Sequence, residues 1–256
     1  VNFFNSLGFS LIIKINFMDS IFVIVGNLPE QLHYERLLTV LLRGYRITKR
    51  WQVCSTHKFV LCCHYKKASL EHNTTKIVTG NGLFTSPECD NTKPKGIAVA
   101  RIDNKAALLQ DLTIDNPSAL CDAAFFQACY VNWGADFCKQ LEGDFCYALW
   151  DDDMSQLHLA RNTFNTRSLY YLPLNGALFV ACDAKILSRH PDLNVTVNKS
   201  AVLKWLSGRP DPNESMFNEI ALLPSGHRLV FSGDGDIDTQ KIWDIDPEVF
   251  IRYQKD

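Results

Sequence analysis

The sequence has little of what marks a nucleic-acid-binding, membrane-spanning or disulfide-stabilised protein. Its net charge is only −2, and no basic stripe with interleaved aromatics is present, so charge gives no case for a nucleic-acid partner. The longest apolar run, LGFSLIIKINF, is short and carries Lys14 in its middle, which argues against a membrane span. The nine cysteines include no CxxC pair, and their odd number argues against a disulfide scaffold. We therefore expect a soluble protein of the reducing cytoplasm.

Patterns for metal ions and phosphate groups are also missing. The seven histidines are scattered singly, without metal-ligand spacing. The SGDGD stretch, Ser232 to Asp236, has no following helix, so it predicts a hairpin turn rather than a phosphate loop. The alternating acids after Gly233 lack the glycine of a calcium loop, and Ile245 stands where its closing glutamate belongs. We expect neither a metal nor a cofactor in this chain.

The order of apolar and polar segments predicts strands alternating with helices. Apolar residues make up 46% and charged residues 21% of the chain, as in ordinary globular proteins. Antiparallel hairpin signals include Asn175-Gly176 and the acidic turn at 151–153, whereas 64–95 is polar and predicts loops with at most one short strand. The expected strands are 20–26, 51–56, 58–65, 96–102, 143–151, 156–162, 168–174, 177–183 and a final hairpin within 226–244. The expected helices are 30–42, 103–112 capped by Asp103 or Asn104, 117–133 with Pro117 in its first turn, 184–189 and 199–207.

No internal repeat or convincing linker divides the chain. We expect one domain over residues 18–247, of the α+β class, because long antiparallel runs are interrupted by grouped helices. Residues 1–17 are interpreted as an extension that is not native, with Met18 as the natural start. Residues 248–256 are interpreted as the beginning of a linker to a missing synthetase domain.

Three ordered blocks in the second half carry a specific signal. The blocks read, in consensus, L-x-G-x-F-A-F-A-x-x-D, then L-x-x-A-R-D-x-x-G-x-x-P-L-Y-Y, then F-A-S-E-x-K-A-L. Over residues 138–191 the chain resembles the N-terminal glutaminase domain of asparagine synthetases, which has these blocks. LLPSGHRLVF and IWDID, later in the chain, resemble that family's L-P-P-G-H block and W-D-L ending. The matching residues of the three blocks are Leu141, Gly143, Phe145, Ala148, Asp151, Leu157, Ala160, Arg161, Leu169, Tyr170, Tyr171, Phe179, Ala181, Lys185 and Leu187.

The resemblance implies a fold and a chemistry. The fold is the N-terminal nucleophile (Ntn) hydrolase type, a four-layer αββα sandwich of two mostly antiparallel sheets. The family begins Met-Cys-Gly-Ile, and the exposed cysteine supplies both the attacking thiol and an α-amino base. In this chain Met18-Asp19-Ser20-Ile21 falls on that beginning. Asp19 offers no thiol, so no catalytic residue is expected, and the use of Ser20 would require cleavage after Asp19.

The motifs that form the family's substrate pocket are also altered in this chain. Its R-G-P-D arginine, a bidentate clamp for the glutamine carboxylate, is best matched by Arg43. Its N-G-E-I-Y-N block, the source of oxyanion-hole donors, falls on residues 99–104, and its S-D-x-E block falls near 115–118. A valine cannot replace an asparagine side chain aimed at developing negative charge. The expected remnants of the pocket are Arg43, Val99, Ala100, Arg101, Asp115 and Asn116.

Two arginines of the strand blocks have a structural interpretation. The family's arginine-aspartate pair is here Arg161-Asn162, and its glycine and proline are Asn165 and Ser168. We expect Arg161 and Arg167 to tie strands together or to contact a neighbouring domain, rather than to act in catalysis.

The resemblance leads to one main hypothesis and two alternatives. The main hypothesis is a pseudoenzyme that cannot hydrolyse glutamine. It would be the structural partner of an ATP-pyrophosphatase-type synthetase or cyclase domain. The chain is also considered as a homodimer. ATP and Mg²⁺ are expected only in that partner. The first alternative is an active amidotransferase that supplies ammonia for asparagine biosynthesis, and the second is a stand-alone module that binds a small metabolite. The most informative single observation is whether an S-G-G-x-D-S ATP-pyrophosphatase signature is encoded just downstream.

Overall fold

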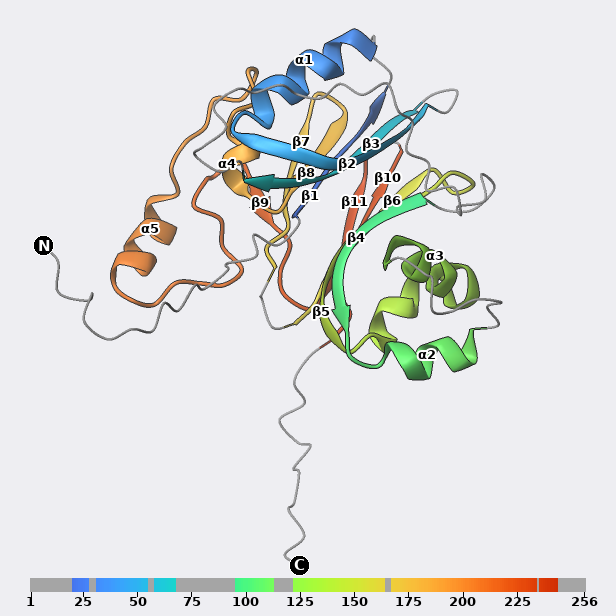
Figure 1. The fold of residues 1–256 in the computed structure, drawn as a ribbon. Coiled ribbons are helices and arrows are strands. Elements are labelled where there is room, and N and C mark those ends of the chain that lie inside the picture. Colours follow the sequence, from blue (N-terminus) through green and yellow to red (C-terminus); the bar gives the residue numbers. More distant parts are fainter. Residues whose placement is uncertain are drawn as a thin grey trace, which may run out of the picture.

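The structure is a computed structural model that describes residues 20–27, 31–54, 58–67, 95–112, 122–163, 167–233 and 235–243. Within them two antiparallel sheets lie face to face, and helices cover their outer faces (Figure 1). The predicted α+β class and the αββα layer order are therefore confirmed. None of the described helices is both long enough and apolar enough to cross a membrane.

In the described part of the chain the first sheet has six strands, with the apolar strand β1 inside it. Its order is β2 (Tyr45–Cys54), β3 (Lys58–Lys67), β1 (Ser20–Asn27), β8 (Ala177–Ala181), β7 (Tyr170–Leu174) and β9 (Ala221–Leu222). Residues 21–25 of β1 have no exposed surface, because alternate side chains enter cores on opposite faces of the sheet. Burial on both faces explains why β1 is a continuous apolar run rather than an alternating one.

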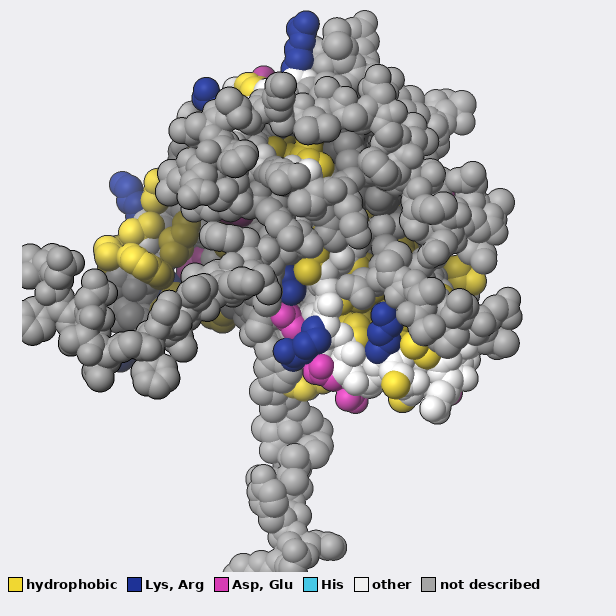
Figure 2. All heavy atoms as spheres, in the orientation of Figure 1, with side chains coloured by type: hydrophobic (Ala, Val, Ile, Leu, Met, Phe, Trp, Pro, Cys, Tyr) yellow, Lys and Arg dark blue, Asp and Glu magenta, His cyan; other side chains and the backbone are white. Residues whose placement is uncertain are grey.

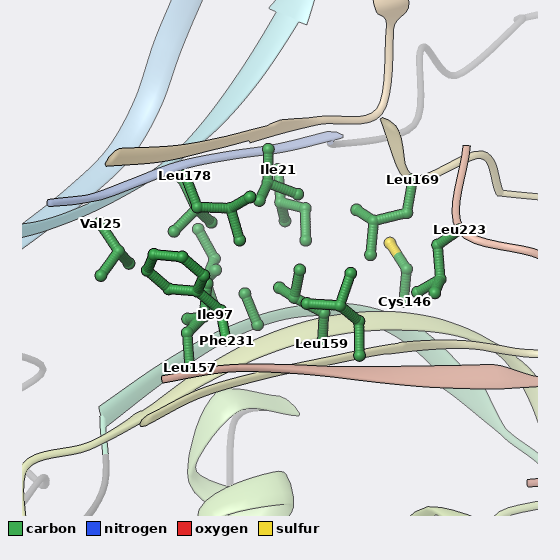
Figure 3. Close-up of a cluster of buried hydrophobic side chains, with 14 of the residues drawn as sticks. Ile21, Val25, Ile97, Cys146, Leu157, Leu159, Leu169, Leu178, Leu223 and Phe231 are labelled. Atoms are coloured by element: carbon green, nitrogen blue, oxygen red, sulfur yellow. The ribbon is translucent and has the colours of Figure 1, made fainter. Parts of the chain in front are cut away.

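The second sheet, as far as the structure describes it, has five strands and lies against the first. Its order is β11 (Ile237–Lys241), β10 (His227–Ser232), β6 (Gln156–Arg161), β5 (Gly143–Asp151) and β4 (Lys95–Ile102). Between the sheets lies the inner core, in which Ile21, Val25 and Leu178 face Leu157 and Phe231 (Figure 3). The inner core consists of Ile21, Val23, Val25, Ile97, Cys146, Ala148, Trp150, Leu157, Leu159, Leu169, Leu178, Val180, Leu223, Leu229 and Phe231.

The helices close the outer faces of both sheets. On the first sheet lie α1 (Gln31–Leu41) and α4 (Ala184–Leu187), which share an outer core with Phe22 and Ile24. On the second sheet lie α2 (Lys105–Asp111), α3 (Asp122–Trp133) and the 3₁₀ helix η2 (Gly134–Gln140), which form an outer core with β5. Helix α5 (Lys199–Leu206) lies away from the second sheet in Figure 1.

Most predicted elements are present, and two of them differ in detail. Strand β2 starts six residues earlier than expected, at Tyr45, because it pairs with β3 over its whole length around a bulge near Ile47. Asn104 does occupy the N-cap of α2, but its side chain accepts from the Glu142 amide and donates to the Gln140 carbonyl instead of capping the helix. Helix α3 is described only from Asp122, so the expected first turn at Pro117 lies outside the described residues. Residues 1–17 and 248–256 lie outside them as well.

Two predicted turns are confirmed. Asn175 and Gly176 have φ of 52° and 74°, as a two-residue hairpin of the type I′ kind requires, and they join β7 to β8. The SGDGD stretch joins β10 to β11, so it belongs to a hairpin and not to a strand–helix phosphate loop.

Candidate functional site

The start of β1 meets the second sheet through two cysteines. The Ile21 carbonyl accepts from the Cys182 amide at 3.2 Å, and the Ile21 amide lies 3.5 Å from the Cys182 sulfur. The Cys182 sulfur in turn lies 4.0 Å from the sulfur of Cys146 on β5. Asp19, which the resemblance aligns with the family's nucleophile, lies outside the described residues and directly precedes Ser20, the first residue of β1 in the sequence. The described residue next to this position is therefore Ser20, at the end of β1 where Ile21 contacts Cys182.

Val99 lines the inner core beside this end. It pairs across the sheet with Cys146 and packs partly buried against the inner core (Figure 3 shows Cys146 with Leu169 and Leu223 at one end of it). An alkyl group there cannot donate a hydrogen bond to an oxyanion. Ala100, the next residue, packs instead against the outer core of the second sheet.

Arg101 is directed to solvent. Its side chain is 74% exposed and forms an ion pair with Asp103, with Nε 3.1 Å from Oδ1. An exposed pair of this kind contributes little to stability and leaves the guanidinium away from the inner core.

Arg43 lies on the other side of the first sheet. It is exposed in the turn between α1 and β2, and its carbonyl accepts from Arg189 Nη1 at 2.7 Å. The neighbouring Tyr45 hydroxyl donates to Asp183 Oδ2 at 2.6 Å, and burial together with this bond raises the pKa of Tyr45 to about 12. Leu42 and Tyr45 belong to the outer core of the first sheet, whereas Val99 belongs to the inner core. The structure thus places Arg43 and Val99 in different layers.

Arg161 and Arg167 gather around Cys146. Arg161 is completely buried and pairs across β6–β5 with Cys146. Its guanidinium donates to the Arg167 carbonyl at 3.2 Å and to Ser225 Oγ at 3.1 Å, so it joins separate loops. Arg167 Nε lies 3.4 Å from Asp144 Oδ2, and both side chains are largely buried. Burial lowers the pKa of Arg161, yet an arginine stays charged at neutral pH.

The structure brings together only part of the set that the sequence suggested. Val99 and Arg161 pair with Cys146 on neighbouring strands, and Arg167 is hydrogen-bonded to Arg161, whereas Arg43 and Arg101 lie elsewhere. Asp115 and Asn116 lie outside the described residues. Sequence reasoning missed Cys182. A signal was present, because this chain has a cysteine at a position where the block consensus has a serine.

No metal centre is evident in the part of the chain that the structure describes. There, no three histidine, cysteine, aspartate or glutamate side chains lie close enough to hold an ion together.

Comparisons with known proteins point in one direction. Residues 101–243 match the family model of the glutamine amidotransferase domain. Asparagine synthetase (glutamine-hydrolysing) 3 of Bacillus subtilis is 25% identical over 121 residues, which are 46% of this chain and 20% of that protein. Asparagine synthetase (glutamine-hydrolysing) 2 of the same species is 32% identical over 106 residues, which are 39% of this chain and 14% of that protein. The match therefore covers a fifth or less of each synthetase.

A solved structure supports the fold. The structure described as the allosteric regulatory enzyme of purine biosynthesis superposes with a TM-score of 0.52 over 88% of this chain and 49% of that chain, at 12% identity. Such a likeness concerns the fold alone. Because the family match covers more than half of the 256 residues and the αββα layers agree with it, the chain belongs to the glutamine amidotransferase domain family.

Proposed function

We propose that this chain is a glutaminase-like domain of an asparagine synthetase-related protein that does not hydrolyse glutamine. In this proposal it serves as the structural partner of an ATP-dependent amide-forming domain. The observation that carries the proposal is Asp19, which stands at the nucleophile position immediately before β1.

The chemistry at this position supports the loss of hydrolysis. Attack on an unactivated amide needs a strong nucleophile and a base, which the family combines in one cysteine with a free amine. A carboxylate is a weak nucleophile towards an amide and supplies no thiol. Loss of one oxyanion donor alone typically costs about 3 kcal/mol of transition-state stabilisation. Val99, an alkyl side chain in the inner core, stands where the family's asparagine donor is expected.

An exposed apolar surface on α5 supports a partner. Leu203, Trp205 and Leu206 are 66%, 59% and 67% exposed, and they form what we call the α5 patch (Figure 2, the hydrophobic group beside α5). Exposed apolar side chains that gather on one surface often mark an interaction site. The helix is held in place, because the Asn198 side chain accepts from the Ala201 amide and Lys204 Nζ lies 2.8 Å from Glu214 Oε2.

The occupant we propose for the α5 patch is the synthetase domain. The two Bacillus subtilis synthetases are named for glutamine hydrolysis and extend far beyond the part that matches this chain. A domain that does not supply ammonia would still have a use as a contact surface for the amide-forming part.

Covalent trapping separates this function from an active amidotransferase. A glutamine analogue with a diazoketone electrophile is incubated with the full chain, with and without excess glutamine, and the intact mass and peptide map are measured. We expect that no adduct disappears when excess glutamine is present. A stoichiometric adduct that excess glutamine suppresses would show that a glutamine-binding nucleophile exists, and the scaffold proposal would fail.

A further inference from the structure

The two cysteines at the end of the inner core form a close pair from different sheets. Cys146 lies on β5 of the second sheet, whereas Cys182 follows β8 of the first. Their sulfur atoms are 4.0 Å apart. A disulfide requires about 2.05 Å between sulfurs, so the two sulfur atoms would have to approach each other by about 2 Å.

The two sulfurs have different surroundings. Cys146 has no exposed surface, and Cys182 is partly exposed. The contact with Cys146 lowers the pKa of Cys182 below that of a free thiol, helped by the Ile21 amide and by Arg167, although burial and Asp183 oppose the effect. The same contact and burial raise the pKa of Cys146. Cys182 is therefore the more accessible and the more nucleophilic of the two, since the thiolate is the reactive form.

Neither cysteine is part of the family's usual blocks. In the first block the residue after Phe145 is alanine, and in the third the residue after Ala181 is serine, yet this chain has cysteine in both places. Two other cysteines, Cys129 and Cys138, are buried in the outer core of the second sheet. Burial raises the pKa of Cys129 to about 12, as expected for an inert structural thiol.

We propose that Cys146 and Cys182 are a dithiol site that reacts with low-molecular-weight disulfides of the glutathione class. The Cys182 thiolate attacks one sulfur of the small disulfide, a mixed disulfide forms, and one thiolate leaves and takes up a proton. The Cys146 sulfur then attacks Cys182 Sγ, loses its proton and releases the second small thiol. The protein is oxidised by two electrons, and one disulfide is reduced to two thiols.

The product would be a covalent link between the two sheets. It would join β5 to the segment that follows β8, beside the start of β1, where Cys182 exchanges backbone and side-chain contacts with Ile21. This proposal does not depend on whether the domain hydrolyses glutamine, because neither step involves that reaction.

The test is peptide mapping of the full chain after reaction with glutathione disulfide. The reduced protein is incubated with the disulfide, quenched with N-ethylmaleimide and digested, and cysteine-containing peptides are quantified. In the unchanged chain we expect a Cys146–Cys182 cross-linked peptide that a reductant removes. Cys182 should react at least about tenfold faster than the buried Cys129.

Three variants identify the order of the steps. Cys146→Ala should accumulate the mixed disulfide at Cys182, and Cys182→Ser should leave Cys146 unmodified. Both changes restore the residue of the block consensus, so both variants are expected to fold. The matched control, Cys138→Ala, should form the cross-link at an unchanged rate.

Two results would overturn the proposal. One is an unchanged chain in which other cysteines acquire glutathione while the Cys146–Cys182 peptide stays absent. The other is a Cys146→Ala protein whose Cys182 reacts no faster than Cys129. Because the mapping of the unchanged chain needs no variant, a folding defect in a variant cannot rescue the proposal.

Discussion

At the scale of single residues, the buried Arg161 makes the sharpest stability prediction. It is fully buried and donates to Arg167 O, Pro212 O and Ser225 Oγ, so its truncation removes hydrogen bonds from several loops and leaves a cavity. We expect Arg161→Ala to lower the free energy of unfolding by about 3 kcal/mol or more, measured by urea denaturation.

The matched control for this change is another arginine with a partner at the surface. Arg101→Ala removes an exposed ion pair with Asp103 and should change the free energy of unfolding by less than about 1 kcal/mol. Equal effects of the two variants would mean that the contacts of Arg161 do not join the loops as described.

The buried His158 makes a prediction about pH. Its Nε2 lies 3.1 Å from the Tyr130 hydroxyl, which itself donates to Asp151 Oδ2 at 2.8 Å, and burial lowers the pKa of His158 to about 4. Between pH 6.5 and about pH 4, His158 binds a proton in the unfolded chain but not in the folded chain. The free energy of unfolding therefore falls as the pH falls. This single group should cost about 1.5 kcal/mol between pH 6.5 and pH 5.

The measurement for His158 compares two proteins at several pH values. The free energy of unfolding of the unchanged chain should fall more steeply from pH 6.5 to pH 5 than that of His158→Gln. The amide of glutamine can still donate to Tyr130 but does not titrate. Parallel curves for the two proteins would contradict the assignment of a depressed pKa to His158.

The same scale shows what sequence could and could not reveal about the site. The proposed replacement of the nucleophile can be inferred from the sequence, because it depends only on the identity of Asp19 beside a strongly patterned strand. The separation of Arg43 from Val99 is not visible, since it depends on which face of each sheet a side chain occupies. The contact between Cys146 and Cys182 joins residues of different sheets, and no local pattern encodes their distance.

At the scale of elements, the start of β5 depends on one glycine. Gly143 has φ of +140°, and an added Cβ would overlap the carbonyl oxygen of Arg101 on β4. Gly143→Ala should therefore destabilise the protein by about 3 kcal/mol, because backbone strain and a steric clash with main chain combine.

The control for Gly143 is a glycine with similar strain and free space. Gly208 has φ of +74° with no atom within 4 Å of an added Cβ, so Gly208→Ala should cost only about 1 kcal/mol. Thermal or urea unfolding of both variants measures the difference. Indistinguishable stabilities would indicate that β4 and β5 do not approach as closely as described at Gly143.

The sequence was enough to predict which segments form helices and strands, but not where each one begins and ends. The hairpin through Asn175-Gly176 was predictable because that dipeptide favours the positive φ values that the turn requires. The early start of β2 at Tyr45 was not, because those residues pair with a strand across a bulge and do not alternate cleanly. Likewise, the Asn104 side chain found partners near η2, a tertiary contact that its position before a helix does not reveal.

At the scale of the whole molecule, three separate cores explain the layer order. The inner core joins the two sheets, and an outer core on each sheet joins it to its helices. The apolar run of β1 supplies two of these cores at once, so the central strand and the stacking of layers are specified together.

The α5 patch makes a prediction about assembly at this scale. The probe is the synthetase domain of a related asparagine synthetase, and its binding to the full chain is measured by calorimetry. Trp205→Glu should weaken that binding about thirtyfold or more, since exposed tryptophans are frequent energetic centres of interfaces. Met154→Glu, at a 63% exposed apolar residue in the β5–β6 turn, is the control and should bind normally. Equal losses, or none in either variant, would contradict docking through α5.

Glutamine hydrolysis by the purified full chain tests the central claim most directly. Glutamate and ammonia are quantified over time, with asparagine synthetase (glutamine-hydrolysing) 3 of Bacillus subtilis as the positive control and Asp19→Ala beside the unchanged chain. The account predicts that the unchanged chain releases no more glutamate than the Asp19→Ala protein or buffer. Glutamate release well above background that disappears in Asp19→Ala would contradict it.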